Sequence, residues 1–320
     1  MKRTAKGWLL AGAFLVVLGL LVFAVTMTVH RWDFSALSST RMETNTLEIR
    51  DAFDSISIRT DTDDIVFLPS GDGKCSVVFY EEEKVKHRAS VRNGTLVIDA
   101  EDTRTWLDRI GFSFGDARVT VCLPRGDYAS LTVGESTGDV TVPGDFTFER
   151  MEITVSTGSV NCSAPVSGKL QIKTGTGGIR LEELSAGELS LTASTGGVEL
   201  RSVACRGGIE LNVSTGKALL KDVACRDLIS GGSTGDLTLE NVIASERISV
   251  ERSTGDVRFE GCDAGELSVR TDTGDVTGTL LSGKVFLVQS DTGRVEVPKT
   301  VSGGRCEIAT DTGDILIETP

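Results

Sequence analysis

The segment Leu189-Ser-Leu-Thr-Ala-Ser-Thr-Gly-Gly-Val-Glu-Leu200 shows how this 320-residue chain is built. Apolar and polar residues alternate before its Thr-Gly pair and again after it, which predicts two short strands, each with one buried face, joined by a tight turn. Glycine gives the backbone the freedom that such a turn needs. The pair recurs ten times at a nearly constant spacing, as Thr137 and Gly138, Thr157 and Gly158, Thr176 and Gly177, Thr195 and Gly196, Thr215 and Gly216, Thr234 and Gly235, Thr254 and Gly255, Thr273 and Gly274, Thr292 and Gly293, and Thr312 and Gly313.

A fixed period of about 20 residues is typical of a solenoid, in which each coil buries its apolar face only by stacking on its neighbours. Counted from the threonine, apolar residues lie six and four positions before it and three and five positions after it, as in Leu170, Ile172, Ile179 and Leu181. A third apolar pair follows eight and ten positions after the threonine, with Leu281 as its larger member in a late coil. We therefore expect an all-β, parallel β-helix-like solenoid of about ten coils, preceded by one transmembrane helix.

Some segments depart from the regular repeat. Ser230 and Gly278 fall on expected core positions, which predicts local weak points. Asp61-Thr-Asp-Asp-Ile65 resembles a degenerate repeat turn, in a region whose strands are longer. We divide the chain into a cytoplasmic tail at 1–7, a transmembrane helix at 8–29, a linker at 30–44, irregular first coils and a cap at 45–130, and regular repeats at 131–320.

The N-terminus carries the signature of a membrane anchor. Lys2, Arg3 and Lys6 precede a long uncharged run, Trp8–Val29. At about 1.5 Å per residue this run can cross a hydrocarbon core of about 30 Å, and the positive-inside rule puts the N-terminus in the cytoplasm and the solenoid outside. A cleaved signal peptide is the alternative, but its apolar core is usually about 7 to 15 residues long and Ala24-Val-Thr26 is a poor cleavage site. We expect a retained single-pass anchor.

The charge balance restricts the partners. Beyond the first seven positions the chain carries 30 basic and 46 acidic side chains. Such a surface repels phosphate backbones and anionic headgroups, so we expect no nucleic-acid partner and a membrane contact only through the N-terminal helix.

Several motifs resemble a known family. They are Trp106-Leu-Asp-Arg-Ile-Gly-Phe112, Val121-Cys-Leu-Pro-Arg-Gly-Asp-Tyr128 leading into Leu131-Thr-Val133, and the run of Ser-Thr-Gly-Asp-Val turns. Together, over about residues 45 to 320, they are similar to the bacterial DUF4097 family of β-strand-repeat, adhesin-like proteins. The resemblance implies a β-helix-like fold, attachment to the cell envelope and, for some relatives, a link to envelope stress. It supplies no catalytic residue.

Asp236, Asp256 and Asp275 lie two positions after the threonine in three consecutive coils. In register they form a carboxylate ladder at about 4.8 Å spacing, where like charges repel unless a cation or water intervenes. A Ca²⁺ ion bound through oxygen ligands is one interpretation. Solvated turn carboxylates are the interpretation that we favour, because the Ca²⁺-binding nonapeptide repeat has a different period.

Catalytic patterns are weak. Asp272, Asp291 and Asp311 begin Asp-Thr-Gly triplets like those of aspartic proteases, but a protease brings two such loops face to face whereas a solenoid stacks them in a row. His30 and His87 both precede the repeats, and no C-x-x-C pair occurs, so the sequence supports neither a zinc site nor a histidine-based triad. We predict a non-enzyme without catalytic residues, metal or cofactor.

The chain contains seven cysteines. Cys205 and Cys225 should lie one coil apart, a separation compatible with a disulfide in an exported protein. We favour buried thiols, because five cysteines occupy positions that other coils fill with small or apolar residues: Cys162, Cys205, Cys225, Cys262 and Cys306.

Three functions fit these observations. The favoured one is a non-catalytic binding, adhesin-like or scaffold module at the bacterial cell membrane, with an envelope protein or a surface glycan as partner. The second is the ectodomain of an envelope-stress sensor, which needs a membrane partner because the short cytoplasmic tail cannot hold a signalling domain. The third is a polysaccharide-active enzyme, which needs long loops that coils as short as these lack.

The end of the chain predicts a contact surface. The last coil finishes at Ile315-Leu-Ile-Glu-Thr-Pro320 with no sequence left to cover it. Uncovered strand edges invite pairing with another chain. We therefore expect Ile315 and Ile317 to lie at an open end that self-associates or contacts a partner.

Overall fold

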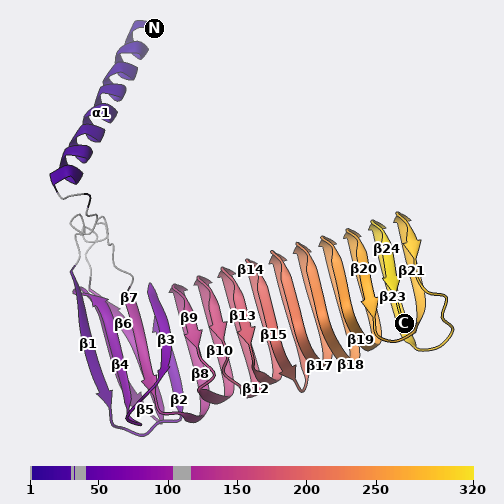
Figure 1. Ribbon diagram of the computed structural model, residues 1–320. Helices are drawn as coiled ribbons and strands as arrows, with labels where there is room; N and C mark the ends of the chain where they lie inside the picture. Colours follow the sequence, from indigo (N-terminus) through magenta and orange to yellow (C-terminus); the bar gives the residue numbers. More distant parts are fainter. Residues whose placement is uncertain (1, 30–31, 33–40, 104–116) are drawn as a thin grey trace.

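The computed structural model describes residues 2–29, 32, 41–103 and 117–320; most of the predicted linker and the Trp106–Phe112 motif lie outside these ranges. One helix, α1 (Lys2–Val29), precedes 24 strands that form one hydrogen-bonded sheet wound into a solenoid (Figure 1). Within α1, Gly12–Val29 has a mean hydropathy of 2.5 and is long enough to cross a membrane. The predicted solenoid fold and N-terminal apolar helix are confirmed.

Each regular coil has one strand before its Thr-Gly turn and one after it, and equivalent strands of neighbouring coils pair in parallel. The strands before the turns are β8 (Gly126–Thr137), β10 (Phe146–Thr157), β12 (Val166–Thr176), β14 (Ser185–Thr195) and β16 (Gly208–Thr215). The strands after them are β9 (Val140–Val142), β11 (Val160–Cys162), β13 (Ile179–Glu182) and β15 (Val198–Cys205). Longer strands then run from one turn to the next: β17 (Ala218–Thr234), β18 (Leu237–Thr254) and β19 (Val257–Thr273).

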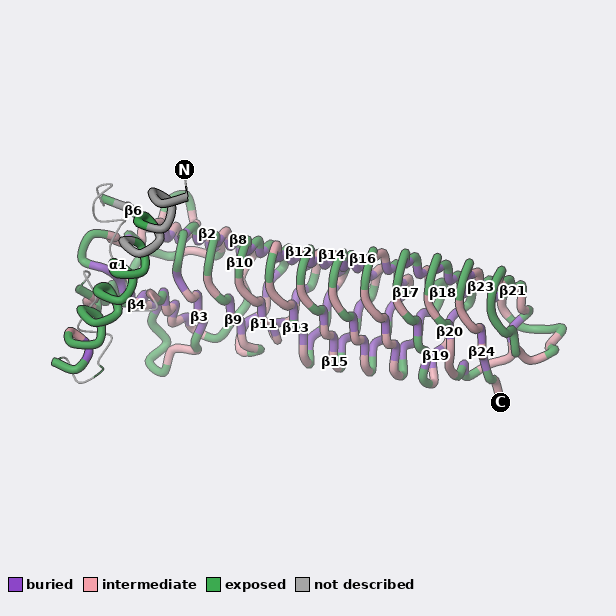
Figure 2. Tube along the Cα trace, turned by 90° about the horizontal axis from the view of Figure 1, so that it is seen from above, coloured by how far each residue is buried: buried purple, intermediate pink, exposed green. Residues whose placement is uncertain are grey.

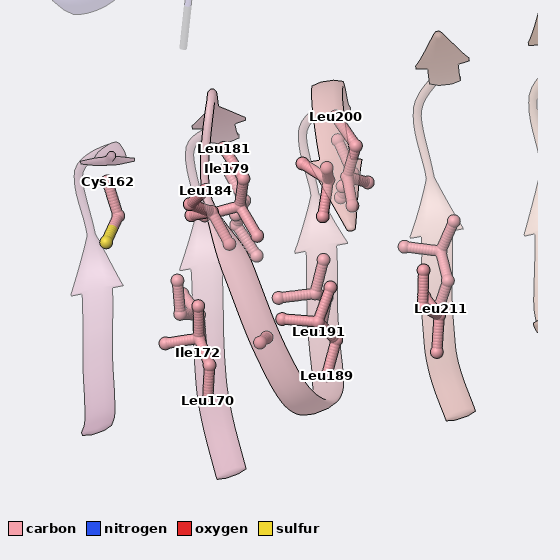
Figure 3. Close-up of a cluster of buried hydrophobic side chains, with 14 of the residues drawn as sticks. Cys162, Leu170, Ile172, Ile179, Leu181, Leu184, Leu189, Leu191, Leu200 and Leu211 are labelled. Carbon is pink, nitrogen blue, oxygen red and sulfur yellow. The ribbon is translucent and has the colours of Figure 1, made fainter. Parts of the chain in front are cut away.

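The predicted alternation places the apolar residues inside the coil. Leu170, Ile172 and Leu181 are 0% exposed and Ile179 is 1% exposed, and their equivalents in the next coils stack on them (Figure 3). Burying one such side chain is worth about 1.5–3 kcal/mol. Figure 2 shows the result along the whole rod, with buried and exposed residues alternating around every coil.

The Thr-Gly turns bring neighbouring coils unusually close. At Gly216 φ is +144°, and a Cβ atom there would lie 2.1 Å from the Gly196 carbonyl oxygen of the preceding coil. The Gly196 N–H in turn donates to the Thr215 carbonyl at 2.9 Å. Only glycine satisfies both the dihedral angle and the space, so the recurring Gly is a requirement of the stacking itself.

A second corner lies seven positions after the threonine. Glu183, Ser202, Asp222 and Asn241 have φ between +52° and +55° there, and Gly261 has φ +63°. The next coil carries Leu280 at this position, and leucine strongly disfavours the left-handed conformation.

The coil with Leu280 avoids the strain by being one residue shorter. The register of β19 against β20 (Val276–Leu280) shifts between Phe259 and Cys262. Leu280 becomes the buried residue, and Leu281 is 51% exposed, so the prediction that Leu281 lies in the core is wrong. Gly278 is required there, because its φ is +135° and a Cβ atom would lie 1.8 Å from the Phe259 carbonyl oxygen.

The other expected weak point, Ser230, is filled from the next coil. Ser230 is 1% exposed, and its Oγ accepts a hydrogen bond from Nη2 of Arg252 at 2.9 Å. Arg252 is 3% exposed, and its guanidinium takes the space that a side chain on Gly232 would occupy. A buried arginine thus replaces the apolar packing lost at Ser230 and Gly232.

The N-terminal end contains two parallel coils and an antiparallel cap. β2 (Ser55–Thr60) and β3 (Asp63–Pro69) pair in parallel with β8 and β9, which confirms that residues 61–65 form a repeat-like turn. β6 (Thr95–Asp102) and β7 (Ala117–Leu123) add a further layer in parallel. In the cap, β4 (Cys75–Glu82) and β5 (Val85–Arg92) pair antiparallel with β7 and β6, and β1 (Met42–Ile49) pairs antiparallel with β4.

A buried ionic cluster joins this cap to the coils. Nδ1 of His87 on β5 lies 2.8 Å from Oε2 of Glu81 on β4, and Nε2 lies 3.0 Å from Oδ2 of Asp63 on β3. The side chains of His87, Glu81 and Asp63 are 1%, 2% and 3% exposed, and the Phe79 ring stacks on the imidazole at 5.2 Å. Only a protonated imidazole can donate to both carboxylates.

Two ionisable groups of this region have pKa values that are shifted in the same direction, upward. Burial lowers the pKa of His87, but hydrogen bonds and charges from Asp63 and Glu81 outweigh it, so the pKa lies above its ordinary value. Burial also raises the pKa of the neighbouring Glu135 carboxyl to about 7. Both groups hold their protons more tightly in the folded protein, so the cap loses stability as the pH rises.

The last two coils are stacked in the reverse of their chain order. β23 (Gly304–Thr312) pairs with β19 on one side and with β21 (Lys284–Thr292) on the other. β24 (Ile315–Glu318) likewise lies between β20 and β22 (Val295–Glu296). Ile315 and Ile317 are therefore 0% and 3% exposed, and the prediction that they form the open end is wrong. Figure 1 shows β21 at the end of the stack instead.

The physical reason lies in the residues of the two coils. The outer coil has exposed Leu287 and Val295, and its short strand β22 is soon followed by Val297 and Pro298. Proline cannot donate a hydrogen bond to a sheet and is tolerated at edges. The observed order gives β23 and β24 a neighbouring strand on both sides and leaves the short strand before Pro298 at the edge.

We predict that Gly216→Ala destabilises the solenoid by on the order of 3 kcal/mol, because the new Cβ clashes with the preceding coil in a left-handed region of the backbone. Urea unfolding followed by circular dichroism measures this change. Gly71→Ala is the matched control, since nothing lies within 4 Å of a Cβ atom there, and should cost less than about 1 kcal/mol. Equal effects of the two substitutions would contradict the close-approach argument.

The reversed coil order predicts unequal effects of two similar substitutions. Ile315→Asp buries a charge between two coils and should destabilise the protein by on the order of 4 kcal/mol. Val295→Asp at the 40% exposed end position should cost less than about 1 kcal/mol. Thermal unfolding of both variants measures these losses of stability. A larger loss for Val295→Asp than for Ile315→Asp would show that the coils follow the chain order.

The ionic cluster predicts a pH-dependent cap. The contribution of Glu135 is lost between about pH 4.5 and about pH 7, and that of His87 is lost above about pH 6.5. Hydrogen exchange of residues 75–92, corrected for intrinsic rates, should therefore be faster at pH 9 than at pH 6. His87→Gln should remove most of this dependence, while Arg88→Gln, on the exposed face of the same strand, should leave it unchanged. Exchange that is equally fast at both pH values in the wild type would refute the prediction.

Candidate functional site

The strands that follow the Thr-Gly turns present a flat outer face. Their outward side chains come from the second and fourth positions after each threonine. At the first of these positions, a side-chain oxygen accepts a hydrogen bond from the backbone N–H of the same position in the next coil, which we call the acceptor ladder. Asp139 accepts from Ser159 N–H at 2.7 Å, and Ser159 Oγ accepts from Gly178 N–H at 3.3 Å.

The same ladder explains the aspartates that the sequence placed in a row. Oδ1 of Asp236 accepts from the Asp256 N–H at 3.3 Å, and Oδ1 of Asp256 accepts from the Asp275 N–H at 2.9 Å. Because of the reversed coil order, Asp314 comes next and donates its N–H to Asp275 at 2.7 Å. The carboxylates thus bind backbone donors, an interaction that the repeat pattern alone did not reveal.

The hydrogen bonds of the acceptor ladder occupy carboxylate oxygens that a calcium ion would need. Each of Asp236, Asp256 and Asp275 uses one carboxylate oxygen for the next coil, and Asp236 also pairs with Nζ of Lys217 at 3.0 Å. The hydrogen bond from Lys217 lowers the pKa of Asp236. Among the described residues, no group of three or more His, Cys, Asp or Glu side chains is arranged to hold a metal ion. The favoured interpretation, solvated turn carboxylates, stays a prediction, as does the calcium alternative.

The acceptor ladder stops at two glycines. Gly178 and Gly197 occupy the ladder position in consecutive coils and have no side chain to offer the next coil. A hollow of about 640 Å³ opens over them, flanked by Ser159, Arg180 and Lys217. We call it the ladder-gap hollow.

Charged side chains border the ladder-gap hollow. Arg180 and Arg201 both pair with Glu199, with the Arg180 Nη2 atom 3.0 Å from Oε2 of Glu199. Burial raises the pKa of Glu199, but the two arginines outweigh it and hold the pKa below its ordinary value. Glu199 is therefore ionised at neutral pH, and its charge is compensated locally.

Two other hollows open where glycine interrupts an outer face. One of about 580 Å³ lies over Gly231 and Gly232, and one of about 470 Å³ lies over Gly278. The glycines there serve the packing of Arg252 and the shortened corner described above. The ladder-gap hollow is different, because Gly178 and Gly197 have no positive φ and meet no atom closer than 3.2 Å at their Cβ positions.

The protease-like triplets lie in a row on exposed turns. Thr273 faces Thr312 and Thr312 faces Thr292, so Asp272, Asp311 and Asp291 follow one another along the stack. All three aspartates are exposed. The Thr-Gly residues of the remaining turns form the continuation of the same column.

The seven cysteines are free thiols, and six of them are buried. Burial raises the pKa of Cys162, Cys225 and Cys306 to about 12. Cys205 and Cys225 directly follow Ala204 and Ala224, which face each other on β15 and β17, so the expected proximity of one coil is confirmed. Protonated buried thiols are poor nucleophiles.

Sequence reasoning missed the buried ionisable groups, although their spacing reveals them. Glu135 lies two positions after Val133 and four after Leu131, both buried, and therefore shares their inward face. Asp63 precedes Ile65 by two, and Glu81 follows Phe79 by two. The period-2 rule that located the core would have placed these carboxylates inside it.

Comparisons with known proteins find several similar solved structures. A "putative adhesin" from Bacteroides fragilis is 14% identical, with a TM-score of 0.42 over 88% of this chain and 99% of the other. A "putative adhesin" from Parabacteroides distasonis is 12% identical, with a TM-score of 0.49 over 85% and 98%. A "putative lipid binding protein" from the same organism is 15% identical, with a TM-score of 0.48 over 88% and 98%. No functionally curated protein matches the chain.

A family model gives the stronger match. It aligns to residues 53–210 and again to residues 206–320, which together cover the described solenoid from β2 to the C-terminus. The resemblance seen in the Val121–Tyr128 motif and the Thr-Gly turns is therefore confirmed. The chain belongs to the DUF4097 (Toastrack) family.

Proposed function

We propose that this protein is a non-catalytic binding module, held at the bacterial cell membrane by α1 with its solenoid on the outer side. The ladder-gap hollow is the observation that carries the proposal, since it is an open recess of about 640 Å³ whose glycines are not required by the packing of the coils. Solenoids typically bind partners through such extended surfaces.

The membrane part of the proposal rests on α1. Its apolar segment Gly12–Val29 follows the basic residues Lys2, Arg3 and Lys6, the charge order expected of a helix whose N-terminus stays in the cytoplasm. The acidic surface beyond it disfavours a second contact with anionic lipids. A tether at one end of a rod leaves the side faces open to an envelope protein or a surface glycan.

The chemistry of the hollow favours binding over catalysis. Its polar side chains are exposed or half-buried, and Arg180 is paired with Glu199 at 3.0 Å. The connections between strands are too short to build a deep cleft around a substrate. The exposed Asp-Thr-Gly turns are stacked side by side rather than face to face.

Photo-crosslinking in intact cells tests this function. A photoreactive amino acid in place of Leu219, which lines the hollow, should capture a partner that co-purifies with the protein. The same amino acid in place of Ile243, which is 37% exposed outside the hollow, is the matched control and should capture less than about a tenth as much. Equal capture from both positions, or none from either, would contradict a binding role for this face.

A further inference from the structure

The ladder-gap hollow contains backbone N–H groups without an acceptor. Their counterparts in most other coils donate to a side chain of the protein itself. In those coils the N–H of the ladder position donates to a side-chain oxygen of the preceding coil, as Ser159 N–H does to Asp139. Gly178, Gly197 and Lys217 occupy the ladder position in three consecutive coils, and none of them has a side-chain oxygen to offer the next coil. Among the hydrogen bonds of the described residues, the N–H groups of Gly197, Lys217 and Asp236 therefore have no acceptor, and the first two of these residues line the hollow.

The neighbouring backbone bonds show that the strand geometry is otherwise regular here. The Ile179 N–H donates to the Gly197 carbonyl and the Val198 N–H donates to the Lys217 carbonyl, both at 3.0 Å. The N–H groups of Gly197 and Lys217 therefore belong to regular backbone, and they lie one coil apart, at about 4.8 Å. They sit in the recess that the missing side chains leave open.

We propose that the ladder-gap hollow binds the carboxylates of an acidic peptide segment, which take the place of the absent aspartate side chains. This proposal rests on the binding function proposed above and names the chemistry of its ligand. The protein itself provides the precedent: Asp256 and Asp275 each place a carboxylate oxygen on the next N–H, at 2.9 Å and 2.7 Å. A ligand carboxylate makes the same charge-assisted bond.

The residues around the hollow support a peptide. Its lining contains no aromatic ring on which a sugar would stack, but it does contain the half-buried side chain of Leu219 beside the polar groups. Arg180 and Lys217 lie at its border, where each already pairs with a carboxylate of this chain, Glu199 and Asp236, at 3.0 Å. Side-chain carboxylates at alternate positions of an extended peptide reach donors one coil apart. Because the donors are open to water, the affinity should be modest, with a dissociation constant of about 1 mM at low salt.

The test uses the full-length protein in detergent micelles, labelled with ¹⁵N-glycine and ¹⁵N-lysine. The probe is the capped peptide Gly-Asp-Gly-Asp-Gly, and the same peptide with asparagine in place of aspartate is the uncharged control. We expect the aspartate peptide to move the Gly197 and Lys217 amide proton signals downfield in a saturable way. The asparagine peptide should bind at least tenfold more weakly.

Two variants that add the same charge at different positions test whether the aspartate peptide binds at the ladder gap. Gly178→Asp supplies the missing carboxylate from the chain itself, and the space allows it, since the closest atom to a Cβ there is the Gly197 oxygen at 3.4 Å. It should shift the Gly197 signal without ligand and weaken peptide binding at least tenfold. Thr238→Asp adds the same charge on the same outer face but outside the lining of the hollow, and should change binding less than threefold.

Several results would overturn the proposal: no movement of the two signals, equal binding of both peptides, or equal loss of binding in the two variants. Saturable binding of oligogalacturonate without binding of the aspartate peptide would also overturn it, in favour of an acidic glycan. A failure of this ligand proposal can be distinguished from a failure of the proposed binding function. Capture of a partner through position 219 without a peptide effect rejects the ligand class alone, whereas absence of capture rejects the function.

Discussion

Neighbouring coils of this solenoid touch most closely at their Thr-Gly turns, and the rest of the structure depends on that approach. A Cβ atom at Gly177, Gly196 or Gly216 would lie 2.0 to 2.2 Å from the glycine carbonyl of the preceding coil. The close contact fixes the register of the strands on both sides of each turn, so that equivalent residues there face each other from coil to coil. Core residues, ladder residues and charged pairs all inherit this alignment.

Much of the architecture could be predicted from the sequence because the repeat is strict. The period located the turns, and alternation about them identified inward residues such as Leu191 and Leu200, both 0% exposed. Where the prediction was wrong, a single residue had changed the local geometry. Leu280 cannot occupy a left-handed corner, and that one substitution moved the chain by a position relative to its neighbour.

Other features depend on contacts that a periodic pattern does not contain. The strands β21 and β23 have nearly the same apolar spacing, so nothing in the pattern distinguishes which of them stacks against β19. The free N–H donors of the ladder-gap hollow depend on hydrogen bonds between successive coils, which the sequence pattern does not contain. The ionic cluster around His87 joins strands far apart in the chain, although the inward parity of Glu81 and Glu135 was already a sign of it.

The reversed order of the last two coils also concerns how the molecule is made. A repeat protein can usually fold by adding one coil after another to a growing stack. Here β23 and β24 separate two coils that precede them in the chain, so residues 284–297 cannot reach their final place until residues 304–318 have been synthesised. Removal of residues 304–318 would therefore remove an interior coil and leave residues 284–297 without the strands on which they stack.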